Sequence, residues 1–296
     1  MILLLTALVT LGAHAQLLYK ISGNGLTSPS YIFGTEHLAP VSFVDSVAGL
    51  RNAMAATQQV YGEVLMSEMT NMENMLKMQQ AMMMPDGKLI SDLLTSSQLS
   101  SLCEYMKEVL GEMAESPMVK QQMLRMKPSA LTVSLQTALF AKRHPDFNFQ
   151  DGLDKYFQDE ALKANKTVGG LETIDDQINA LFNITPLDRQ TALLMCLVEN
   201  KEDTERQTDN LVNAYMAQDL DGVQTVMDER NNNSCDPMPE EENILIYNRN
   251  ANWMQKMPSL MSEKSTLFVV GAGHLPTDRG LLQLLRNAGY TVEGVK

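Results

Sequence analysis

The sequence contains few cysteines, few basic residues and no long apolar segment. Three cysteines, Cys103, Cys196 and Cys235, are too few and too widely spaced for a disulfide framework, although one bridge is possible. Lysine and arginine number 23 against 36 aspartate and glutamate residues, which gives a formal net charge of −13. Because nucleic acids and anionic membranes attract concentrated positive charge, this balance argues against both as partners.

The apolar segments are also short. No stretch approaches the roughly 20 apolar residues of a transmembrane helix, so the sequence predicts no membrane span.

Residues 1–15 contain no Lys, Arg, Asp or Glu, and they end in Ala13-His14-Ala15 after an apolar run. This pattern is typical of a cleaved secretory signal peptide. We therefore expect residues 16–296 to work outside the cytoplasm, in the periplasm or as a secreted protein.

The remaining chain alternates strand-like and helical patterns. Short runs rich in β-branched and aromatic residues predict strands at 17–21, 31–33, 59–61, 167–171, 266–270 and 291–295. Long helices are expected at about 240–261 and 276–288, and nearly everything from 66 to about 165 has a helical period. These patterns predict an α/β fold with a central mixed, largely parallel sheet flanked by helices. We expect a single domain, 16–296, with a long all-helical insertion at about 66–165.

Two Gly-x-x-His segments follow predicted strands near opposite ends of the chain. They are Gly34 to His37 and Gly271 to His274. In open α/β sheets, ligands bind outside the carboxyl ends of the strands, so both imidazoles are candidates for one crevice. Two carboxylates, Glu63 and Glu172, follow two further strands in the same way. Two imidazoles and one or two carboxylates suit a divalent metal, and a second carboxylate suits a general base.

Each of these residues also has a structural interpretation. A histidine after a buried strand is often a hydrogen-bonded structural group, and short motifs match by chance. Glu63 is also explained as a charge at a helix N-terminus, and Glu172 as a cap of the helix that follows it. The sequence leaves these alternatives open.

Taken together, the motifs resemble the TraB/GumN family, which includes the Tiki-type metalloproteases. The resemblance rests on residues 32–38, Glu63, residues 170–173, Arg249-Asn250 with Trp253, and residues 270–275. It implies a divalent-metal-dependent hydrolase of erythromycin-esterase-like fold, with the two histidines and a carboxylate at its centre. The family's first acidic motif is commonly Glu-Leu-Asp, and here it reads Glu63-Val64-Leu65, so no role passes to a following aspartate.

The resemblance also places Arg249 and Asn250 near the site. A guanidinium can hold a substrate carboxylate or a developing oxyanion, and an amide can orient water. The alternative is that Arg249 pairs with Glu172 or Glu63 as support for the metal ligands.

A methionine tract lies at the start of the predicted insertion. Met66, Met69, Met72, Met75 and Met78 recur every three residues, and Met82 to Met84 follow. On an α-helix this spacing winds around the axis, so a simple core face is not expected. The open interpretations are a helix that lines a groove, a partner or substrate surface, and, least favoured, a Cu(I) site.

The preferred hypothesis is an extracytoplasmic metal-dependent hydrolase that acts on a peptide or protein substrate. Its metal ligands are predicted as His37, His274 and Glu63, with Glu63, Glu172, Arg249 and Asn250 as catalytic residues. Mn, Co and Zn are each chemically suitable. Two rivals stay open: a metal-independent esterase-like hydrolase, and a non-catalytic protein that sequesters a secreted peptide or metal.

Overall fold

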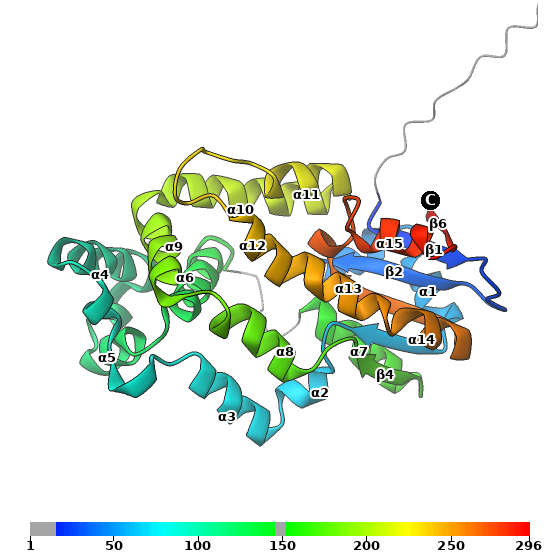
Figure 1. Ribbon diagram of the computed structural model, residues 1–296, viewed down its shortest axis with the longest axis horizontal. Helices are drawn as coiled ribbons and strands as arrows, with labels where there is room; N and C mark the ends of the chain where they lie inside the picture. Colours follow the sequence, from blue (N-terminus) through cyan, green and yellow to red (C-terminus); the bar gives the residue numbers. More distant parts are fainter. Residues whose placement is uncertain (1–15, 146–151) are drawn as a thin grey trace, which may run out of the picture.

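The computed structural model describes residues 16–145 and 152–296, and their fold is mixed α/β as the sequence predicts (Figure 1). The expected signal peptide lies outside the described residues. All six predicted strands are confirmed, and they form one sheet in the described part of the chain. The strands are β1 (Leu18–Ser22), β2 (Ser30–Thr35), β3 (Gln59–Gly62), β4 (Thr167–Gly170), β5 (Thr266–Gly271) and β6 (Thr291–Gly294).

The sheet has the strand order β4-β3-β5-β2-β1-β6, and its first four strands run parallel. β1 pairs antiparallel with β2 and with β6. β5 is central: residues 266–270 are all buried, as expected for a strand covered on both faces. Helices on the two faces complete this main core, and the largest fully buried side chains include Trp253, Tyr215 and Phe157.

The elements between β3 and β4 are helical throughout the described residues. They include α2 (Met66–Met69), α3 (Met72–Ala81), α4 (Ser96–Leu110), α5 (Pro117–Leu124), α6 (Pro128–Arg143) and α7 (Leu153–Lys163). A second core, with Leu102, Leu131 and Leu194 among its members, joins α4 and α6 to α9 (Leu187–Glu199). The helices between β3 and β4 therefore share their core with α9, which follows β4 in the sequence. The helix α7, in contrast, packs against the sheet.

The remaining helices lead back to the sheet. They are α1 (Leu50–Ala56), α8 (Ile174–Ile178), α10 (Lys201–Met216), α11 (Leu220–Met227), α12 (Pro239–Glu242), α13 (Asn248–Met254), α14 (Met257–Glu263) and α15 (Leu281–Asn287). Figure 1 shows α12, α13 and α14 following one another toward the sheet, with α13 and α14 passing in front of the strands.

Two helix predictions need correction. The stretch 240–261 is not one helix: a π-helical segment, Asn243–Tyr247, separates α12 from α13, and Pro258 lies in the first turn of α14. Proline cannot continue the preceding helix because it lacks an N–H. The helix expected to begin at Pro276 begins at Leu281, since Thr277 adopts a positive φ of 75° that an α-helix excludes.

The cysteines form one bridge. Cys196 in α9 is joined to Cys235 in the loop before α12, while Cys103 is free. Beside the bridge, Arg189 bonds both carboxylate oxygens of Glu241, at 2.7 and 2.8 Å, and the two side chains are each 12% exposed.

No helix in the described ranges is long and apolar enough to cross a bilayer.

Candidate functional site

The ends of three parallel strands bring Glu63, Glu172 and His274 together. In the register of the sheet, Gly62 of β3 pairs with Val269 of β5 and with Gly170 of β4. Glu63 follows directly, and the amide of Glu172 donates to the carbonyl oxygen of Glu63 at 2.9 Å. His274 closes the short 3-10 turn Ala272–His274 after β5. Residues distant in sequence thus share one edge of the sheet because parallel strands end at the same side.

Arg249 of α13 lies between the two carboxylates. Its Nε and Nη2 atoms donate to both oxygens of Glu172, at 2.9 and 2.7 Å, and Nη2 also donates to Glu63 at 2.5 Å. Nη1 donates to the carbonyl oxygen of Leu245 at 2.9 Å and lies 3.2 Å from Nε2 of His274. A guanidinium has five N–H donors, so every one of them has a partner.

Glu63 is ionised in this environment. Its Oε1 accepts from the backbone N–H of Gly271 at 2.8 Å, and Oε2 accepts from Arg249. Burial opposes the charge, but attraction to His274 and Arg249, together with the two hydrogen bonds, outweighs it and lowers the pKa of Glu63 to about 2.

His274 is buried and held in one tautomer. The amide nitrogen of Asn250 donates to two carbonyl oxygens, of His274 and Arg279, at 3.2 and 3.1 Å. Its amide oxygen therefore faces Nδ1 of His274, at 2.7 Å, and Nδ1 carries the proton. Burial lowers the pKa of His274 to about 4, so the neutral ring presents a lone pair on Nε2 toward Arg249 and Glu63.

Glu172 holds Arg249 and does not cap the following helix. Its side chain is 6% exposed, and besides Arg249 it accepts from Nε1 of Trp253 at 3.1 Å. Thr173 forms the N-cap of α8. Asn250 is fully buried with both ends of its amide bonded, so it positions His274 and has no exposed atom for a water.

The two motif glycines permit close packing at the strand ends. A Cβ on Gly271 would lie 3.2 Å from Oε1 of Glu63, and one on Gly34 would lie 3.0 Å from the Cα of Ala272. A side chain at Gly34 would push the turn that carries His274 away from β2.

His37 occupies the rim of the site. Its side chain is 78% exposed, and Nδ1 lies 3.3 Å from a carboxylate oxygen of Asp154 in α7. The other Asp154 oxygen accepts from the hydroxyl of Thr35 at 3.1 Å. The bond to Asp154 raises the pKa of His37 to about 9, although water around so exposed a ring screens the pair. His37, Glu63 and Asp154 line one pocket of ≈290 Å³.

The site has donor chemistry that suits a divalent cation. Nε2 of His274 and Oε1 of Glu63 lie 3.8 Å apart, within the span of about 4 Å that two ligands on one cation allow. A metal-binding histidine commonly donates its second ring N–H to a protein oxygen, as His274 does to Asn250. Two buried carboxylates face one guanidinium, which leaves one negative charge for a cation to compensate. No group of three or more His, Cys, Asp or Glu side chains in the described residues has the arrangement of a metal site.

Sequence patterns did not reveal three supporting groups. Asp154 lies in the first turn of α7, where acidic residues are common for helix stability alone. Gln158 bonds the backbone on both sides of Leu65, from Val64 at 2.8 Å to Met66 at 2.9 Å, and so fixes the loop after Glu63. The third group is the backbone N–H of Gly271, which donates to Glu63, and the type of side chain in a sequence does not reveal where a backbone N–H points.

Comparison with known proteins identifies the family. The profile of the TraB/PrgY/gumN family matches residues 17–294. The chain belongs to this family. The predicted resemblance is thereby confirmed over nearly all of the described residues. No solved structure matches the chain.

Three curated relatives carry the name metalloprotease TIKI. A TIKI homolog of Nematostella vectensis is 24% identical over 311 residues, which cover 91% of this chain and 65% of that protein. TIKI2 of Xenopus tropicalis and TIKI1 of Danio rerio are each 22% identical and cover 90% of the chain. The chain spans 57% and 60% of these two relatives, so it matches only part of each.

Proposed function

We propose that this protein is an extracytoplasmic, divalent-metal-dependent hydrolase that cleaves peptide bonds, with His37, His274 and Glu63 as metal ligands. The observation that carries the proposal is the pair formed by Glu63 and His274 at the ends of β3 and β5, in which the unprotonated Nε2 lies 3.8 Å from a carboxylate oxygen. The names of the TIKI relatives support a metalloprotease-like role. The Cys196–Cys235 bridge is compatible with an oxidising compartment.

His37 is the third proposed ligand. It follows β2, the strand beside β5, and it lines the same pocket as Glu63. Asp154 bonds Nδ1 of His37, so Nε2 is the nitrogen left to bind a cation. To bind a cation, the ring would have to release the proton that its bond to Asp154 stabilises.

Mn, Co or Zn bound to these ligands would polarise the scissile carbonyl and activate a water for hydrolysis. Arg249 would stabilise the oxygen that gains charge in the transition state. If Nε2 of His274 were a metal ligand, the N–H that Arg249 directs at it would be free to bond that oxygen. Glu172 fixes Arg249 through two hydrogen bonds, and Asn250 fixes the tautomer of His274.

A metal-independent esterase-like hydrolase is the second candidate. It is favoured by the guanidinium of Arg249, which already supplies a cation between Glu63 and His274. In this case a histidine acts directly as the base, and chelators leave the activity unchanged.

Metal content and hydrolysis of the purified protein test the proposal. We expect wild type to hold one divalent ion per chain and to cleave members of a defined peptide mixture, with loss of cleavage in chelator and recovery with Mn, Co or Zn. His37→Gln and His274→Gln should lose the ion. His144→Gln is the matched control because His144 is exposed and stacks on Phe140, 4.2 Å away.

Full hydrolysis in chelator by metal-free protein would reject the metal mechanism. Metal or peptide binding without any turnover would instead support a sequestering protein.

A further inference from the structure

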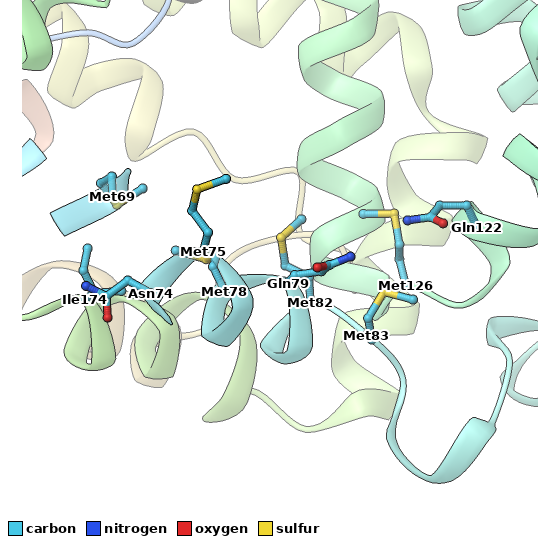
Figure 2. Close-up of a pocket in the computed structure, with 10 residues that line it drawn as sticks. All are labelled: Met69, Asn74, Met75, Met78, Gln79, Met82, Met83, Gln122, Met126 and Ile174. Atoms are coloured by element: carbon cyan, nitrogen blue, oxygen red, sulfur yellow. The ribbon is translucent and has the colours of Figure 1, made fainter. Parts of the chain in front are cut away.

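A methionine-lined pocket lies beside the candidate site. Its volume is ≈280 Å³, and six thioether side chains line it, from Met69, Met75, Met78, Met82, Met83 and Met126. Figure 2 shows these side chains coming from α2, from α3 and the residues after it, and from the facing segment that carries Met126. The other lining residues are Asn74, Gln79, Gln122 and Ile174, so no charged side chain borders this space.

The helix α3 presents much of its apolar surface to solvent. No residue of α3 is buried, and Met72, Met75 and Leu76 are 70%, 51% and 50% exposed. The helix is nevertheless capped at its start and tied to a neighbouring segment just after its end. The side chain of Asn71 caps its N-terminus, and two backbone bonds of 2.7 Å tie Met84 to Arg125 and Lys127 to Met82. An anchored helix with an exposed apolar surface is typical of a binding site.

The methionine pocket continues into the candidate site on one side. Met69 lines this pocket and also the pocket of His37 and Glu63. Asn74 and Ile174 line both the methionine pocket and a further pocket of ≈340 Å³ that contains Glu172. The apolar surface therefore borders the residues proposed to act on the substrate.

On its other side the methionine pocket borders a basic pocket. Met83 lines both, and the basic pocket has a volume of ≈640 Å³. Its charged side chains are Lys88, Lys120 and Arg125, and none is acidic. These three cations are exposed, and within the described part of the chain none has a carboxylate partner. In a protein with a net charge of −13, such a cluster favours an anionic group.

We infer that the pocket of His37 and Glu63, the methionine pocket and the basic pocket form one substrate groove for an extended peptide, with uncharged apolar residues next to the scissile bond and an acidic residue beyond them. Thioether side chains adapt to apolar groups of different shape, so the methionine pocket selects apolar character without demanding one residue. The basic pocket fixes the position of the acidic residue. This assignment rests on the proposed function because it names the substrate class of the same site.

Peptide binding in the presence of chelator tests the groove without turnover. Three fluorescent peptides of equal length are compared by anisotropy: one with Leu and Met residues followed by Asp residues, one with Lys replacing Asp, and one with Ser replacing Leu and Met. We expect the first to bind at least about tenfold more tightly than the other two. Met75→Gln and Gln122→Glu should remove most of that preference, and Lys120→Glu should reverse the preference for Asp over Lys.

Matched controls lie on the same helical part. Met72→Gln changes an exposed methionine of α3 that lines no pocket described above, and Lys142→Glu does the same for an exposed lysine of α6. Both should bind the peptides as wild type does. Equal binding of all three peptides, or equal effects of Met75→Gln and Met72→Gln, would overturn the groove. So would a dimer of the protein alone that Met75→Gln separates, because the surface would then belong to a second copy.

Failure of the groove can be distinguished from failure of the proposed function. A protein that holds metal and cleaves peptides without this preference retains the function and loses the groove. A protein that shows the preference but neither holds metal nor cleaves any peptide retains the groove and loses the function.

Discussion

The amide oxygen of Asn250 lies 2.7 Å from Nδ1 of His274, and this contact decides which ring nitrogen carries the lone pair. Both residues are buried, and two further bonds from Asn250 fix its amide. The tautomer is therefore set before any ligand binds. The buried amide of Asn250 in α13 thus leaves Nε2 of His274, after β5, without a proton and able to accept a hydrogen bond or bind a cation.

Replacing Asn250 by leucine should weaken metal binding and lower stability. We expect a loss of about 10–100-fold in affinity for Zn²⁺ or Mn²⁺, which is usual when a residue that orients a ligand is removed. Each carbonyl oxygen left without a donor should cost about 1–3 kcal/mol. Calorimetric titration and urea unfolding measure the two effects. Asn252→Leu, an exposed change on the same helix, should alter neither. Unchanged metal affinity in Asn250→Leu would contradict the positioning role.

Replacing Arg249 by methionine should leave two buried carboxylates unpaired. Arg249 is 14% exposed, and removal of one partner of a buried ion pair costs about 3–5 kcal/mol. Arg206 is the matched control, because its pair with Asp203 is exposed and worth at most about 1 kcal/mol. Urea unfolding of both methionine variants in chelator at pH 7 gives the comparison. Equal losses of unfolding free energy would show that water screens the Arg249 pairs.

The contribution of Glu241 to stability should depend on pH. Burial opposes its ionisation, but hydrogen bonds from Arg189 and the backbone of Met238 outweigh this and lower the pKa of Glu241 below its usual value of 4.5. A carboxyl group with a lowered folded pKa adds stability above its unfolded pKa, and this stability is lost as the pH falls through the folded pKa.

Glu241→Gln should therefore destabilise the protein by about 1.5–3 kcal/mol at pH 7, the range for a hydrogen bond to a charged group. The difference from wild type should shrink between pH 4.5 and more acidic values. Denaturant unfolding at several pH values measures it, and Glu240→Gln, an exposed change on the same helix, serves as control. A difference that stays constant with pH would contradict this account.

Removal of the Cys196–Cys235 bridge should destabilise the protein. The cysteines are 39 residues apart in sequence, and loop-closure entropy predicts a loss of about 4 kcal/mol when the bridge is absent. The double variant Cys196→Ser, Cys235→Ser is compared with Cys103→Ser by thermal unfolding. Cys103 is free, so its replacement should cost much less. A reductant should lower the melting temperature of wild type and leave that of the double variant unchanged.

The strands and the residues at their ends could be predicted from sequence because local patterns determine both. The run 266–270 is apolar and β-branched, and the structure buries all of it in β5. Glu63, Glu172 and His274 each follow such a run, and parallel strands end at one edge of a sheet. The family resemblance added Arg249, whose helix has no strand end to mark it.

Other parts of the site had no local signal. Three of the four residues that Arg249 contacts, Glu63, Glu172 and His274, come from separate segments of the chain. The pairing of Arg189 with Glu241 depends on how α9 meets α12. His37 and His274 have matching motifs, yet one is 78% exposed and the other buried. Exposure depends on what packs over a residue, which spacing alone does not reveal.

The sequence by itself determined the α/β class, the six strands and the chemical groups at their ends, since these depend on neighbours a few residues away. The tertiary structure decided which of those groups meet. The register of β3 on β5 joins residues more than 200 positions apart, and α13 adds the guanidinium and the amide that set their charge and tautomer. Burial in that packing keeps His274 neutral, whereas Glu63 stays ionised against burial because Arg249 and the N–H of Gly271 bond its oxygens.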